Sequence, residues 1–110
     1  MRLFAEPPAS SCVYTIRHLG ALRKAESEGG GTWDESKTWR SAAAMLEQSM
    51  DEGTWTPIFF AAADRVSGLL YVARLDSVEL EHTNIDYTHY SFSNIVRSGT
   101  GTTDIHVTLT

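Results

Sequence analysis

Residues 56–81 read TPIFFAAADRVSGLLYVARLDSVELE, and this stretch decides the fold. Two runs rich in apolar, β-branched and aromatic residues, 58–62 and 69–75, flank a polar connection that ends in Ser67-Gly68. This pattern predicts an antiparallel β-hairpin. Both runs carry apolar side chains on both faces of the pleat, so the hairpin must be covered on both sides. We therefore expect a closed or nearly closed β-barrel with helices packed on it.

The bulk composition predicts one globular domain over residues 1–110. The chain has 110 residues, of which 42% are hydrophobic and 21% are charged, enough for a single core. No apolar run of about 18 residues and no signal-peptide pattern is visible, so we expect no membrane span and a cytoplasmic location. The lone Cys12 excludes an internal disulfide. The formal net charge of −5 disfavours binding through phosphates, so any nucleic acid should be bound at a local site.

The segment before the hairpin predicts a strand and a short helix. Residues 12–19 are β-branched and aromatic, which favours a strand to about Leu19. Good helix formers follow in residues 21–26, and a single helix over 11–28 is the rival interpretation. The run Gly29-Gly30-Gly31 then predicts a mobile loop or hinge.

An amphipathic helix is predicted over residues 36–50. Thr32 and Glu35 have the spacing of a capping box, which places a helix start soon after the glycines. Gly53 is the expected C-cap. The apolar stripe with helical spacing consists of Trp39, Ala42, Ala43, Leu46 and Met50.

Beyond the hairpin the sequence predicts more strand. The second hairpin strand continues through residues 76–81, with Val78 and Leu80 facing inward. Residues 82–88 are polar and predict a loop, whereas residues 89–96 contain apolar strand-like positions. A final alternating strand is expected at residues 104–109.

This order of elements resembles the EVE and YTH group of PUA-like domains over roughly residues 13–81. The resemblance rests on the Trp-bearing segment, the helix pattern, the Phe59-Phe60 run and the return strand 68–73. The matching residues before that run are Trp33, Ala43, Leu46, Met50 and Gly53. The helix has one residue more than the family pattern between Leu46 and Met50, and Thr54 stands where an acid is expected. The resemblance implies an α+β fold, a small PUA-like β-barrel with two packed helices, within a wider group that includes ASCH-like domains.

The resemblance also implies a function. Such domains hold a single, often modified, nucleobase in an aromatic-lined pocket between the barrel and a helix, where stacking and edge hydrogen bonds act together. Trp33 matches a ligand-contacting position. Neighbouring candidates chosen by adjacency are Trp55, Phe60, Tyr90 and Arg40. The expected partner is a single-stranded or modified nucleic acid, or a small nucleobase-like ligand, with no cofactor and no metal.

Each candidate has a structural alternative. The Trp33 ring could cover the core instead of contacting a ligand. Trp39 is in phase with the apolar stripe of the helix and should be a core residue. The four histidines have no metal-ligand spacing, and a Ser/His/Asp arrangement around His89 and Asp86 lacks a nucleophile motif. We therefore expect a non-catalytic recognition module. The alternative is a small-molecule or protein-binding domain on the same barrel with no nucleic-acid role, which the acidic balance favours.

Overall fold

The computed structural model describes residues 6–63, 70–82 and 86–99. They form two helices and one five-stranded sheet, so the predicted α+β class is confirmed. The opening strand and short helix are also confirmed, and the single helix over 11–28 is excluded. In chain order the elements are β1 Val13–Arg17, α1 Leu19–Glu28, β2 Gly30–Glu35, α2 Arg40–Glu52, β3 Thr56–Ala62, β4 Leu70–His82 and β5 Asp86–Gly99.

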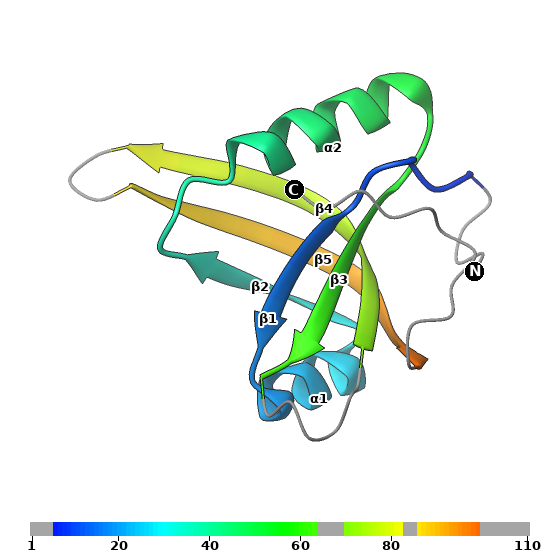
Figure 1. Cartoon of the computed structure of the whole chain (residues 1–110), viewed down its shortest axis with the longest axis vertical. Coiled ribbons are helices and arrows are strands. Elements are labelled where there is room, and N and C mark those ends of the chain that lie inside the picture. Colours follow the sequence, from blue (N-terminus) through cyan, green and yellow to red (C-terminus); the bar gives the residue numbers. More distant parts are fainter. Residues whose placement is uncertain (1–5, 64–69, 83–85, 100–110) are drawn as a thin grey trace.

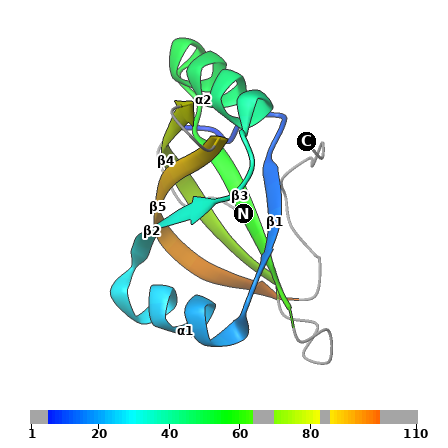
Figure 2. The same cartoon turned by 90° about the vertical axis from the view of Figure 1, so that its left-hand side faces the viewer.

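The sheet is curled into a half-barrel. Its strand order is β1-β3-β4-β5-β2, with β1 parallel to β3 and every other neighbouring pair antiparallel. Figure 1 shows α2 and α1 at opposite ends of the curled sheet. The quarter-turn in Figure 2 shows the edge strands β1 and β2 on either side of an opening, which we call the seam. Within the described residues, no backbone ladder closes this seam.

The predicted hairpin is present. β3 and β4 are antiparallel, with Ile58 opposite Ala73 and Phe60 opposite Tyr71. The predicted loop at 82–88 is wrong at both ends, because β4 extends to His82 and β5 begins at Asp86, so that Glu81 pairs with Tyr87. Backbone hydrogen bonds between β4 and β5 extend both strands into this segment, although its polar side chains favour a loop. The predicted strand at 104–109 and the hairpin turn at Ser67-Gly68 lie outside the described residues.

The hairpin is apolar on both faces because two separate clusters use it. The second cluster, on the outer face of the hairpin, consists of Cys12, Trp55, Phe59 and Val72. The main cluster, inside the curl, consists of Val13, Leu22, Ala25, Ala42, Ile58, Phe60, Ala62, Tyr71, Ala73, Leu75, Tyr90, Phe92 and Ile95. Full burial of one large apolar side chain stabilises the fold by about 1.5–3 kcal/mol. Alternating residues of β3 therefore tie both layers to the same strand.

The glycine run is neither a loop nor a hinge. Gly29, at φ 81°, is the left-handed C-cap of α1, and β2 begins at Gly30. A Cβ on Gly30 would collide with the Phe92 carbonyl oxygen and lie 2.9 Å from the Ser93 Cα. Glycine is required because β2 and β5 approach so closely. The capping box of Thr32 and Glu35 is also wrong, since both residues lie in β2.

The second helix begins four residues later than predicted. Trp39 occupies the N-cap position, and its backbone N–H donates to Thr88 Oγ1 over 2.8 Å. The Thr88 hydroxyl in turn donates to the Lys37 carbonyl over 2.7 Å, so β5 holds the segment before α2 out of the helix. Gly53 is the C-cap, as predicted, at φ 71°.

The buried face of α2 also differs from the predicted stripe. Ala42 and Ser49 are buried, and Leu46 is half-buried against the main cluster. Met50 is 70% exposed. The Ser49 hydroxyl is accommodated because it donates to the Thr54 carbonyl over 2.8 Å, so a polar side chain takes a place that the apolar pattern had given to Met50.

The close approach of β2 to β5 gives a stability prediction. Gly30→Ala should destabilise the protein by about 1–3 kcal/mol or more, because the new Cβ meets backbone atoms that cannot move cheaply. Gly20→Ala is the matched control. Gly20 lies in α1 with open space around it, so its replacement should be neutral or stabilising by about 0.5–1 kcal/mol. Urea unfolding midpoints would measure both, and equal shifts would contradict the requirement for glycine at position 30.

Candidate ligand-binding site

The best-formed cleft of the described residues lies on the seam. Its volume is about 310 Å³. One wall is the edge strand β1, and the other is the end of β2 together with the start of α2. The lining residues are Val13, Tyr14, Thr15, Glu35, Ser36, Lys37, Thr38, Trp39, Ser41 and Ala42. The site therefore combines two aromatic side chains, one carboxylate, one lysine and several hydroxyl groups.

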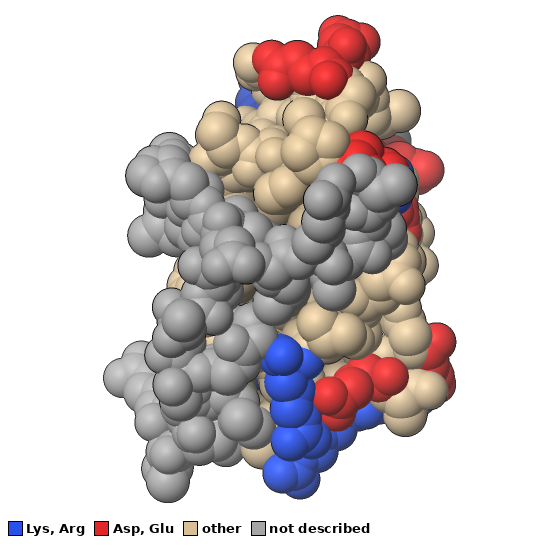
Figure 3. Space-filling view, turned by 90° about the vertical axis from the view of Figure 1, so that its right-hand side faces the viewer, with Lys and Arg blue, Asp and Glu red and all other residues tan. Residues whose placement is uncertain are grey.

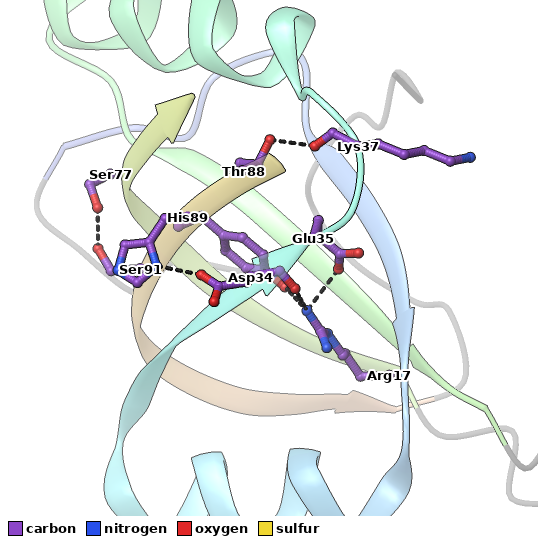
Figure 4. Close-up of polar contacts among 9 residues, drawn as sticks. Arg17, Asp34, Glu35, Lys37, Ser77, Thr88, His89 and Ser91 are labelled. Carbon is purple, nitrogen blue, oxygen red and sulfur yellow. Dashed lines mark hydrogen bonds and ion pairs between the residues drawn. The ribbon is translucent and has the colours of Figure 1, made fainter. Parts of the chain in front are cut away.

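Arg17 bridges the seam beside this cleft. From the end of β1 its Nη2 donates to the Asp34 carbonyl over 2.9 Å and to Glu35 Oε1 over 2.8 Å, both in β2 (Figure 4). The same nitrogen donates to the Tyr90 hydroxyl over 3.2 Å. The guanidinium carbon also lies 4.7 Å from the centre of the Trp33 ring, within cation–π range. A side chain thus joins the two edge strands where no backbone ladder does.

Aromatic rings support the site from inside the curl. The Tyr90 and Trp39 rings stack with their centroids 4.7 Å apart, which places the buried Tyr90 directly beneath a residue that lines the cleft. Burial raises the pKa of Tyr90 to about 12, although Arg17 acts in the opposite direction. The Tyr90 hydroxyl is therefore neutral at physiological pH and acts as a hydrogen-bonding group of the support.

In the wall formed by residues 36–41, hydrogen bonds to Thr88 fix the backbone, whereas several side-chain hydroxyls are available to a ligand. Thr88 clamps Lys37 and Trp39 through the two hydrogen bonds described above. Within the described part of the chain, no protein group bonds the hydroxyls of Ser36, Thr38 or Ser41. A ligand in the cleft can therefore use these hydroxyls as either donors or acceptors.

The structure brings three of the five sequence-predicted site residues together. Trp33, Phe60 and Tyr90 meet inside the curl, with Trp33–Phe60 centroids 5.3 Å apart and Trp33–Tyr90 centroids 6.5 Å apart. Arg40 is exposed as the first residue of α2, beside the cleft wall. Trp55 is buried in the second cluster on the other face of the hairpin, away from this group.

None of the residues that line the cleft was among the five predicted site residues, and Trp39, Glu35 and Tyr14 are the three whose chemistry matters most. Trp39 was assigned to the apolar stripe of the helix, and Glu35 to a capping box. Tyr14 lies in the stretch 12–19, which the sequence predicted only as a strand. Its signal was available, because the alternation with inward-facing Val13 and Thr15 turns Tyr14 outward, to the rim of the cleft.

Trp33 lies on a strand, not on the loop that the glycines predicted. Its ring is half-buried and also contacts Phe92, with centroids 4.8 Å apart. A second cleft of about 220 Å³, between α1 and β2, reaches Trp33 beside Lys24 and Glu28. Most of what surrounds Trp33 is nevertheless core and the Arg17 guanidinium.

Two ion pairs of the described residues lie near the site, Arg17 with Glu35 and His89 with Asp34. No group of three or more potential metal ligands gathers among residues 6–63, 70–82 and 86–99. His89 pairs with Asp34 across β5 and β2. The hydrogen bond that the protonated His89 ring donates to the Asp34 carboxylate raises the pKa of His89, with smaller contributions from Glu79 and Glu81.

Comparison with known proteins found no family, no curated protein and no solved structure that matches this chain. Neither of the two helices in the described residues has the length and apolar character needed to span a membrane.

The surroundings of Trp33 predict a structural role for its ring. Trp33→Ala should lower the free energy of unfolding by about 3–5 kcal/mol, because it removes packing in the core and the surface on which Arg17 rests. Tyr87→Ala, at an exposed aromatic position of β5, is the control and should change stability little. Thermal melts of the two variants would compare them. A Trp33→Ala variant that melts like the wild type would restore the alternative, in which this ring is presented to a ligand.

The His89–Asp34 pair predicts a pH-dependent stability. Because the folded-state pKa of His89 lies above its unfolded value, the stabilisation is complete below about pH 6.5 and is lost as pH rises through the raised pKa. The difference in unfolding midpoint between the wild type and His89→Gln should therefore be largest below about pH 6.5 and should shrink as pH rises through the raised pKa of His89. Asp34→Asn should largely remove this pH dependence. A difference that stays constant with pH would show that the pair does not form in solution.

Proposed function

We propose that this protein is a non-catalytic recognition module that binds a single nucleobase in the seam cleft. The base would be free or presented by a single-stranded or modified nucleic acid. The observation that carries the proposal is the composition of the cleft, which puts Trp39 and Tyr14 beside the Glu35 carboxylate and three unbonded hydroxyls. Aromatic side chains stack on the face of a base, and polar groups read its edge.

The dimensions of the cleft favour a small planar ligand. Its volume of about 310 Å³ lies at the lower end of the range of about 300–1,000 Å³ typical of ligand pockets. The proposal includes a small PUA-like barrel of the EVE and YTH type, which the curled sheet with two helices supports. It also includes a cytoplasmic location, which the lone cysteine of the sequence favours.

The charge distribution favours recognition of the base over recognition of the phosphate backbone. The net charge is −5, and Glu35 lies within the cleft. Figure 3 draws the face opposite the one seen in Figure 2, and there acidic side chains gather at the α2 end while the basic side chains at the α1 end stand beside further acids. Among the described residues, Arg97 Nε lies 3.1 Å from Glu26 Oε2 in an ion pair. Binding should therefore depend only weakly on salt.

A second candidate function has its own observation. Among the described residues β1 is an edge strand, and its outward residues Tyr14 and Ile16 are 41% and 54% exposed. An edge with unpaired backbone groups and apolar side chains can accept an extended peptide as an additional strand. This is the protein-binding alternative on the same sheet, with no nucleic acid involved.

Tyr14 provides a test of the nucleobase proposal. Tyr14→Ala should leave the fold intact and weaken binding by about 1–3 kcal/mol, the range for one base stacked on one aromatic ring. Tyr87→Ala, which removes an exposed tyrosine remote from the cleft lining, is the matched control. The titration would use the four common nucleosides, their methylated forms and short single-stranded oligonucleotides, at two salt concentrations. Wild-type protein that binds none of them, or equal effects of the two variants, would favour the peptide alternative.

A further inference from the structure

We propose, resting on the function proposed above, that Glu35 makes the seam cleft selective for guanine, the base whose edge presents two adjacent hydrogen-bond donors. The proposal rests on where Glu35 lies, on how it is held, and on what a carboxylate can and cannot bond.

Glu35 is held in place before any ligand arrives. It is the last residue of β2 and lines the cleft, with its side chain 24% exposed. Its Oε1 accepts from Arg17 Nη2 over 2.8 Å, and Arg17 is itself fixed by the Asp34 carbonyl and the Tyr90 hydroxyl. Figure 4 shows Glu35 and Arg17 reaching toward each other across the seam. A group that is oriented in advance loses little freedom on binding, which increases its discrimination.

The chemistry of this carboxylate restricts its partners to donors. A carboxylate paired with a guanidinium has about four acceptor positions and no donor, so the bond from Arg17 leaves acceptor positions for a ligand. Guanine offers N1–H and the N2 amine side by side. Adenine, cytosine and uracil each place an acceptor beside the donor on the equivalent edge. That acceptor would face a carboxylate oxygen, which is also an acceptor, so no hydrogen bond could form between the two atoms.

The other lining groups allow this pose. The Lys37 side chain extends away from Glu35 in Figure 4, so it does not take the acceptor positions. The unbonded hydroxyls of Ser36, Thr38 and Ser41 can donate to the guanine carbonyl oxygen, because a hydroxyl rotates to suit its partner. The three hydroxyls can therefore form hydrogen bonds with any base, whereas the fixed Glu35 carboxylate favours a base that presents donors.

The first test uses the wild-type protein and changes only the ligand. Inosine lacks the N2 amine and 1-methylguanosine lacks N1–H, so each should bind about 10–100-fold more weakly than guanosine, the loss of one charge-assisted hydrogen bond. Adenosine, cytidine and uridine should also bind more weakly. Isothermal titration with these six nucleosides measures the series directly.

The second test changes the carboxylate. In Glu35→Gln the amide oxygen can still accept from Arg17, while the amide nitrogen now presents a donor beside an acceptor, which is complementary to the edge of adenine, as to those of cytosine and uracil, and no longer to the two donors of guanine. The preference should therefore move from guanosine toward adenosine, cytidine and uridine. Glu47→Gln, an exposed carboxylate of α2 outside the cleft, is the matched control and should leave the preference unchanged. Thermal melts would show whether Glu35→Gln remains folded, and the wild-type ligand series decides the question if it does not.

The outcomes separate the two proposals. Guanosine binding that exceeds inosine and 1-methylguanosine binding supports the role of Glu35. Nucleosides that bind with similar affinities would overturn this inference and leave the nucleobase function standing, with Glu35 acting only to close the seam. Absence of binding by every nucleoside and by the single-stranded oligonucleotides would overturn both.

Discussion

The Arg17 guanidinium holds the two ends of the sheet together, and the geometry of the site depends on this contact. β1 and β2 are the outermost strands of the order β1-β3-β4-β5-β2, so only the curl of the sheet brings them near each other. Arg17 Nη2 spans the gap to Asp34 and Glu35, while its Nε is buried without a hydrogen-bond partner among the described residues. An unsatisfied buried donor costs about 1–3 kcal/mol. Packing on Trp33 and the ion pair with Glu35 offset that cost.

Because Arg17 joins β1 and β2 through its side chain and not through backbone hydrogen bonds, a cleft remains between the two strands. Had β1 and β2 been joined by regular hydrogen bonds, neighbouring strands would lie about 4.8 Å apart and no cleft could form between them. Arg17 joins them at one end only, and the seam beyond that point remains open toward α2. Thr88 shapes the opposite wall, because its hydroxyl holds Lys37 and Trp39 in a non-helical path. The cleft is therefore a product of two tertiary contacts rather than of any local motif.

The sequence predicted the elements whose causes are local. The hairpin follows from its own apolar runs, and the end of α2 follows from Gly53. The sequence-based prediction failed where a residue far away in the chain determines the local structure. The start of α2 is set by Thr88, which lies 49 residues beyond Trp39 in the chain. The strand at Gly30 forms because β5 approaches too closely for any side chain, so the glycines that predict a loop in isolation are required in a sheet.

The same distinction explains which site residues were found. Aromatic character identified Trp33, Phe60 and Tyr90, and these rings do meet, but as an inner layer that supports Arg17 and Trp39. Residue type cannot distinguish a ring that supports a site from a ring that touches a ligand.

Most residues that face the cleft are of types common on protein surfaces, so their types did not identify them as site residues. They become neighbours only because the sheet is curled. Among them Glu35 differs physically from the hydroxyls of Ser36, Thr38 and Ser41, because those groups rotate to match either a donor or an acceptor. A site lined only by such groups binds many small polar molecules with similar affinity. One carboxylate held by an arginine leaves a mismatched ligand with an unpaired polar group, and unpaired groups account for most of the discrimination in polar sites. In the proposed recognition, the contact that bridges the seam would therefore also hold the group that selects the ligand.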